Sequence, residues 1–114
     1  MLDTNRESLV ELLIDISRKS FTVGRPFEPK IDDNGVQRLD RKTRAPLWAA
    51  QLVVMDDRGA DTIVVTIAGD PPHLQQGQPV TPSQLVAIPW SRNGREGVAY
   101  RAAEVRPLAA AKSA

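Results

Sequence analysis

Through the middle of the chain, apolar and polar residues alternate with a period of two, the pattern of a β-strand that buries one face. In "GADTIVVTIAG" (59–69), isoleucine and valine at the odd positions from 63 to 67 alternate with threonine and valine at the even positions. The run before it, "PLWAAQLVVMD" (46–56), is also rich in strand-forming residues, and "DDRG" supplies turn residues between the two. The pattern predicts a β-hairpin.

Two more β-rich runs follow, "QPVTPSQLVAIPW" (78–90) and "GVAYRAAEVRP" (97–107), joined by "SRNGRE". The joining segment contains Asn-Gly, the dipeptide that a two-residue type I′ turn favours. Trp90 stands at the end of the first run, and Arg92 and Arg95 flank the Asn-Gly pair. We predict a second hairpin whose tip exposes two guanidinium groups, which either keep the hairpin soluble or contact phosphate.

The beginning of the chain fits two patterns. Leucines and isoleucines share a helical face over 9–17, and Thr4 and Glu7 have the spacing of a helix capping box. Apolar residues also alternate there with acidic residues and serine, and "SFTV" extends this strand pattern to about residue 24. A strand over 9–24 is favoured, and a helix over 9–17 stays open. The prolines, glycines and charges of 24–45 predict a long exposed loop or β-arm.

Five predicted strands, with turn signals between them and little helix, define the expected fold class. Such strands in about 100 residues are typical of a small Greek-key barrel of the OB type, with a small β-sandwich as the alternative. At 114 residues the chain has the size of one domain. We predict an N-terminal extension (1–8), an OB-fold-like domain (9–108) and a disordered tail (109–114).

The net charge of +1 hides an uneven distribution of charged side chains. Residues 20–44 carry six basic and four acidic residues, and residues 90–114 carry five and two, whereas residues 45–89 carry one and four. Two basic loops that meet in space would form a patch for phosphate, although a charged run is more often solvated surface.

Several chemistries find no support in the sequence. The chain has no cysteine, which excludes disulfides, thiolate metal sites and a cysteine nucleophile. His73, the single histidine, stands in a polar turn, and no nucleophile with a base is visible. Asp32 and Asp33, followed by Asn-Gly, predict a turn rather than a cation site. With no apolar run near the roughly 20 residues of a membrane span and no signal peptide, we expect a cytoplasmic protein that is not an enzyme and needs no cofactor or metal.

Four stretches, "FTVGRPFEPK", "LDRKTRAPLW", "LVAIPW" and "GVAYRAAEV", resemble a family of small regulatory proteins of actinobacterial plasmids and integrative elements. The order of segments is also similar to the single-stranded-DNA-binding, helix-destabilising protein of filamentous phages. There too an opening strand of the "LLIDISRKSF" kind is followed by a basic arm, then by strands like "APLWAAQLVVMD" and "DTIVVTIAG", and by a closing hairpin. Together these resemblances cover roughly residues 9–108.

The phage resemblance implies an OB-type barrel, a homodimer, and DNA bound by basic and aromatic residues of the arm and adjacent strands. The basic arm carries over as Arg38, Arg41, Lys42 and Arg44. In the phage type an aromatic residue directly follows the proline, whereas here Leu47 follows Pro46 and Trp48 comes one later. Because strand side chains alternate between faces, this shift predicts that Trp48 turns inward.

Binding a single strand also needs flat side chains on which bases stack. Trp90, beside Arg92 at a strand end, suits stacking or a cation–π contact as well as it suits the core. Phe27, between two prolines, is expected in an exposed loop, although it could pin that loop to the barrel. Tyr100 is expected in the core. Trp48 shares strand parity with Leu52, which favours burial over a role as stacking platform.

The sequence thus predicts a single-stranded DNA-binding protein that acts in replication, transfer or regulation of a mobile element. The alternative is an OB-type module that regulates by binding a protein partner, such as a replication or transfer protein. DNA and RNA are not distinguished. The predicted DNA-binding residues are Arg25, Phe27, Lys30, Arg38, Arg41, Lys42, Arg44, Trp48, Trp90, Arg92, Arg95 and Arg101.

Overall fold

Eight β-strands form the described part of the chain, residues 10–108, in the computed structural model. They are β1 (Leu12–Leu13), β2 (Ser20–Pro29), β3 (Leu47–Asp56), β4 (Gly59–Ala68), β5 (Pro79–Ser83), β6 (Val86–Arg92), β7 (Arg95–Arg101) and β8 (Glu104–Pro107). These residues include no helix, and hence none long and apolar enough to cross a membrane. The predicted all-β class is therefore confirmed.

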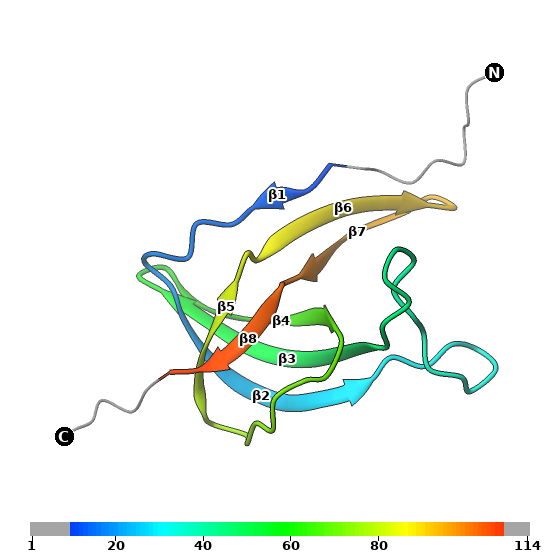
Figure 1. Cartoon of the computed structure of the whole chain (residues 1–114). Coiled ribbons are helices and arrows are strands. Elements are labelled where there is room, and N and C mark those ends of the chain that lie inside the picture. The colour runs from blue at the N-terminus through cyan, green and yellow to red at the C-terminus, as the bar shows by residue number, and fades with distance from the viewer. Residues whose placement is uncertain (1–9, 109–114) are drawn as a thin grey trace.

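All eight strands belong to one curled sheet in the order β1-β6-β7-β4-β3-β2-β5-β8, which makes a half-barrel (Figure 1). Neighbouring strands pair antiparallel except β4 and β7, which run parallel. The β4–β7 pairing covers two positions, Val65↔Tyr100 and Thr66↔Arg101. The sheet thus consists of a large part around β2–β4 and a hairpin, β6–β7, joined to it by a short seam.

The eight strands replace the five predicted ones because three of the predicted runs break, 9–24 near the start of the chain and two in its second half. Residues 78–90 divide at Gln84, whose φ of 52° lies in the left-handed region and ends β5. Residues 97–107 divide after Arg101, so that β7 stays with β6 while β8 pairs with β5. These last two breaks let the chain change neighbours within the sheet.

The N-terminal predictions are partly wrong. The strand expected over 9–24 is interrupted, since only Leu12–Leu13 and the segment from Ser20 onward are strands, with a turn in which the Lys19 amide donates to the Ile16 carbonyl (3.0 Å). The alternative helix does not form in the described residues, which begin at 10. The loop expected from residue 24 starts later, because β2 continues to Pro29. The predicted extension (1–8) and tail (109–114) lie outside the described residues.

The core fills the concave side of the sheet. It is made of inward-facing side chains of β2, β3, β4, β5 and β8 together with loop residues, including Phe21, Val23, Leu52, Val65, Ile67, Val80 and Val105. The predicted alternation holds in β4, where Val65 is fully buried and Val64 is 51% exposed. Residues 46–56 and 59–69 form the predicted hairpin, in continuous register from Leu47↔Ala68 to Asp56↔Gly59.

Residues 30–46, named here the basic arm, connect β2 to β3 and project beyond the ends of both strands (Figure 1). Its first loop is the predicted turn, in which Oδ1 of Asp32 accepts hydrogen bonds from the Asn34 and Val36 amides (2.8 and 3.0 Å) and Gly35 has a φ of 80°. The second loop rises toward the tip of the β6–β7 hairpin in Figure 1. Segments far apart in sequence therefore face each other across this end of the molecule.

Candidate nucleic-acid interface

Asp40 fastens the basic arm to the sheet. It is the one charged side chain that the structure buries among residues 10–108, at 7% exposure. Nη2 of Arg101, on β7, donates to its Oδ1. Its Oδ2 accepts from the amides of Lys42 and Thr43 (3.1 and 2.9 Å) and from the Thr43 hydroxyl (3.1 Å). The Arg101 hydrogen bond, followed by the Thr43 amide, holds the pKa of Asp40 far below its usual range.

Lys30 begins the arm beside the same contact. Its Nζ lies 3.4 Å from the Thr66 hydroxyl, and Thr66 is the register partner of Arg101. Its carbonyl accepts a hydrogen bond from the Arg38 amide (2.7 Å), which pairs the two ends of the first arm loop. Burial first, and then the nearby charges of Arg38 and Arg101, lower the pKa of Lys30. Lys30, Arg38 and Arg101, named here the cationic cluster, thus unite the two basic segments of the sequence.

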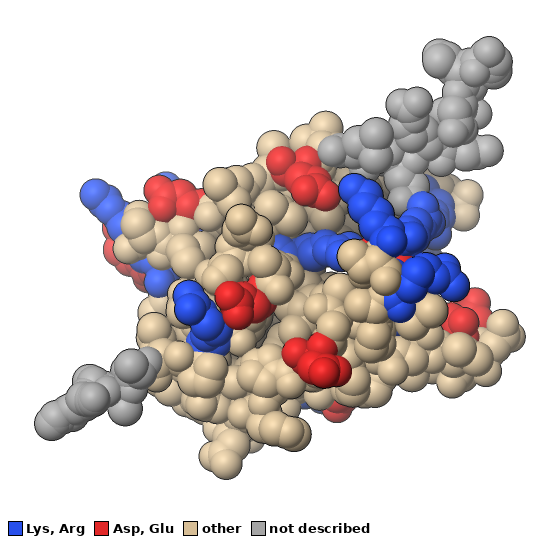
Figure 2. All heavy atoms as spheres, viewed as in Figure 1, with Lys and Arg blue, Asp and Glu red and all other residues tan. Residues whose placement is uncertain are grey.

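The β6–β7 hairpin continues this positive surface. Both turn residues predicted for its tip have positive φ, 53° for Asn93 and 77° for Gly94, as a type I′ turn requires. The register Val86↔Arg101, Trp90↔Gly97 and Arg92↔Arg95 runs without a shift. Because side chains alternate along each strand, Trp90 and both tip arginines lie on the same face as Arg101. Lys and Arg side chains gather between this hairpin and the arm in Figure 2.

Trp90 is held on this face by its cross-strand partner. A Cβ at position 97 would lie 2.6 Å from Cζ2 and 2.8 Å from Cε2 of the indole, so the ring covers Gly97 closely. Trp90 is nevertheless 42% exposed, so the contact with Gly97 leaves a large part of the residue open to solvent. A glycine beneath an aromatic ring on a two-stranded ribbon stabilises the ribbon and fixes the ring's orientation.

Phe27 and Trp48 lie elsewhere, in a pocket of about 510 Å³. Both are half-buried and pack against the core, so the prediction that Phe27 stands in an exposed loop is wrong: Phe27 belongs to β2. Trp48 has the strand parity of the buried Ala50 and Leu52 and turns inward, and its Nε1 is buried without a hydrogen-bond partner in the described residues. The lining of this pocket is completed by Pro26, Asp70, Pro71, Pro72, the exposed His73 and Leu74.

The remaining predicted residues are spread over two regions. Arg41, Lys42 and Arg44 are exposed on the second arm loop, where Arg44 has a φ of 66° that closes the turn around Asp40. Arg25 is exposed on β2, with Gln51 of β3 as its register partner. Asp40 and Thr66 were missed as members of the site. The Asp-x-x-Thr spacing of residues 40–43 is the sequence signal that could have indicated the Asp40 loop.

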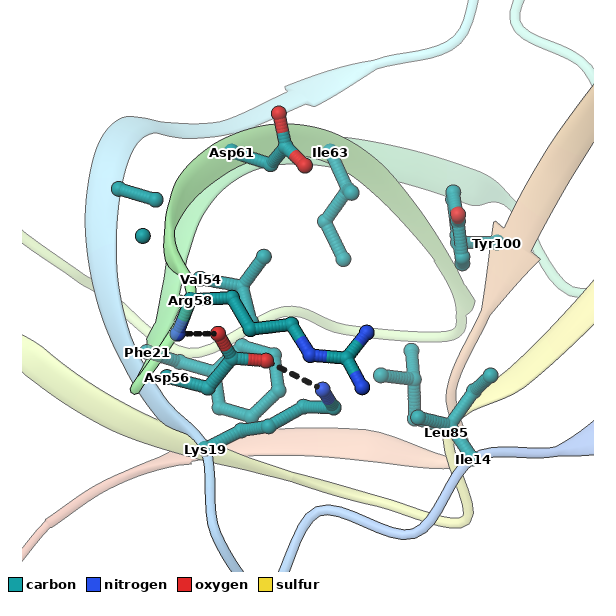
Figure 3. A pocket seen from close by; sticks show the side chains of 12 residues that line it. Ile14, Lys19, Phe21, Val54, Asp56, Arg58, Asp61, Ile63, Leu85 and Tyr100 are labelled. Atoms are coloured by element: carbon teal, nitrogen blue, oxygen red, sulfur yellow. Dashed lines mark hydrogen bonds and ion pairs between the residues drawn. The ribbon is translucent and has the colours of Figure 1, made fainter.

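A second cavity, of about 400 Å³, opens at the other end of the half-barrel (Figure 3). Its walls are both apolar and charged, and the apolar lining residues include Phe21, Val54, Ile63 and Leu85. The charged lining residues are two cations, Lys19 and Arg58, and two carboxylates, Asp56 and Asp61, and Lys19 pairs with Asp56 at 3.0 Å. With its charges balanced, this cavity offers a polyanion no net attraction.

Comparisons with known proteins add no relative, since no family model, curated protein or solved structure matches the chain.

Proposed function

We propose that the protein binds single-stranded DNA and acts in the replication, transfer or regulation of a mobile element in the cytoplasm. The observation that carries the proposal is the meeting of the basic arm with β7. Arg101 pairs there with Asp40 on the hairpin face that also carries the exposed Trp90, and Lys30 contacts Thr66 and lies near the charges of Arg38 and Arg101. Cations for phosphates and an aromatic ring for bases are the two components that such binding requires.

The spacing of the cations along the hairpin suits a flexible single strand of DNA. Arg95 and Arg101 lie six positions apart on β7, which corresponds to about 20 Å along an extended strand. A single-stranded chain can follow this distance with several phosphates, while a base stacks on the outer side of Trp90 and contributes roughly 1–3 kcal/mol. Arg41, Lys42 and Arg44 would then contact phosphates from the arm.

The proposed architecture is an OB-type barrel that works as a homodimer. The curled sheet with its projecting arm supports the first part, and the resemblance to the phage protein supports both. Leu12 and Leu13, on the edge strand β1, are 51% and 72% exposed. Apolar side chains on a free sheet edge favour contact with a second copy of the chain.

The test is a fluorescence titration with oligo-dT, random single-stranded and duplex oligonucleotides at several salt concentrations. We expect binding to both single-stranded probes, weakening steeply with salt as counterions are released, and weaker binding to the duplex. Absence of binding at low salt would remove the proposal and favour a module that binds a protein partner. An RNA probe of the same sequence as the random DNA tests the choice between the two nucleic acids.

A further inference from the structure

We infer that the cationic cluster is a binding site for a phosphate monoester, the group found at a phosphorylated end of a nucleic-acid strand. Lys30, Arg38 and Arg101 come from the start of the arm, its middle and β7, so that one small group could contact three parts of the fold. The inference rests on the proposed function for the source of the ligand. The phosphate site itself can be tested without DNA.

The charges of the cluster do not balance. The cluster has three cations, and the one buried carboxylate that pairs with any of them, Asp40, is bonded to Arg101. Within residues 10–108, neither the Lys30 amine nor the Arg38 guanidinium has an ion-pair partner. Glu11 lines a hollow of about 250 Å³ with Arg101 but forms no ion pair with it in the described residues. The cluster therefore retains about two uncompensated positive charges.

The donors of the cluster are also incompletely used. The Lys30 amine has the Thr66 hydroxyl as its one hydrogen-bond partner in the described residues, at 3.4 Å, and two further N–H groups remain. Arg101 uses Nη2 for Asp40 and has other N–H groups, and its side chain is 41% exposed. Burial is the main cause of the lowered pKa of Lys30, and the repulsion from Arg38 and Arg101, the smaller cause, is the part that a bound anion would relieve.

The charge count favours the terminal group over an internal one. A phosphate monoester carries about −1.5 to −2 at neutral pH, whereas an internal diester of the DNA backbone carries −1. A dianion would neutralise the two uncompensated charges, and an internal phosphate would leave one of them. The monoester also has three strong acceptor oxygens for the donors of three different residues.

The first experiment follows the lysine side chains by NMR while inorganic phosphate replaces chloride at constant ionic strength. The lysines of the chain are Lys19, Lys30, Lys42 and Lys112, so each signal can be assigned by single Lys→Arg variants. We expect a saturable shift of the Lys30 signal, weakened about tenfold in Arg38→Gln, as for the loss of one charge-assisted hydrogen bond. Arg106→Gln is the control, because Arg106 lies on β8 with a 62% exposed side chain. A shift that does not saturate, or that is equal at Lys42, would overturn the site.

The second experiment compares one oligo-dT with a 5′-phosphate, a 3′-phosphate or two hydroxyl ends. We expect one phosphorylated end to bind about tenfold more tightly than the hydroxyl form, and Lys30→Gln to abolish this ratio while Arg106→Gln keeps it. Thermal melting verifies that the variants are folded. Equal affinities for all three forms of the oligonucleotide would overturn the inference and leave the proposed DNA binding intact. Saturable binding of inorganic phosphate without binding of any oligonucleotide would keep the site and remove the proposed function.

Discussion

Single residues decide whether the β6–β7 hairpin presents its aromatic ring. Trp90 lies over Gly97, and a side chain at 97 would displace the indole. We expect Gly97→Ala to destabilise the protein by roughly 1–3 kcal/mol, as for other overpacked sites, and to weaken DNA binding. Chemical denaturation measures the first effect, a titration with oligo-dT measures the second, and the near-ultraviolet circular dichroism of the indole reports the displaced ring. The control is Gly24→Ala, whose Cβ meets the Gln51 carbonyl at an ordinary 3.5 Å; equal losses in the two variants would contradict the proposed packing.

The two tryptophans can be separated by fluorescence. Trp90 is 42% exposed on the basic face, whereas Trp48 packs against the core. DNA should quench the emission of Trp48→Phe, which reports Trp90 alone, and should change that of Trp90→Phe little. Trp90→Ala should cost roughly 1–3 kcal/mol of binding, and Trp48→Ala roughly 3–5 kcal/mol of folding. Quenching that follows Trp48 would place the bases at the pocket beside Phe27 instead.

Asp40 gives the fold a specific dependence on acid. Its pKa is lowered in the folded protein by Arg101 and the Thr43 amide, so its carboxylate stabilises the fold above the unfolded-state pKa of about 3.9. This contribution is lost as the pH falls from there through the folded-state pKa. We expect Asp40→Asn to be less stable at neutral pH but to lose less stability between about pH 5 and pH 2. Denaturation curves at several pH values measure this; the same acid sensitivity in both proteins would contradict it.

At the scale of elements, the sequence predicted what adjacent residues determine. Both hairpins follow from alternation and turn residues next to each other in the chain, and both form. The break at Gln84 was missed because its left-handed φ is imposed by β5 and β6 joining different partners. The Asp40–Arg101 contact joins residues 61 positions apart, so only the folded sheet reveals it. The same holds for Phe27, whose burial depends on the curl of the sheet.

The second arm loop makes the largest contribution of any element to the expected salt dependence. Neutralising Arg41, Lys42 and Arg44 together should lower the slope of log K against log salt by about 2, at roughly 0.7 for each phosphate contact on a single strand. The fold should survive, because these side chains are exposed. A control with the same change in net charge neutralises Arg18, Arg58 and Arg106, which are exposed outside the arm. An unchanged slope in the arm variant would exclude this loop from the interface.

At the scale of the whole molecule, one half-barrel would contact only a short stretch of a long DNA strand. A second copy would lengthen the binding surface. The exposed Leu12 and Leu13 on edge strand β1 are candidates for the contact. Sedimentation should show a dimer at micromolar concentration, and Leu13→Asp should shift it to a monomer with an unchanged circular dichroism spectrum. A wild-type monomer that binds DNA well would count against the proposed dimer.

The short seam between β4 and β7 should also give the β6–β7 hairpin and the main sheet different rates of amide hydrogen exchange. Amides of β3 are paired with strands on both sides, whereas the β6–β7 hairpin meets the described remainder of the main sheet at two positions of β4. Hairpin amides should therefore exchange with deuterium through local opening, at rates well above those of β3. A DNA strand bound across the arm and the hairpin, as we propose, would bind only the form in which the hairpin is paired with β4. DNA binding should then slow exchange in the hairpin and leave exchange in β3 unchanged. Mass spectrometry of peptides from the protein would thereby map where the DNA binds.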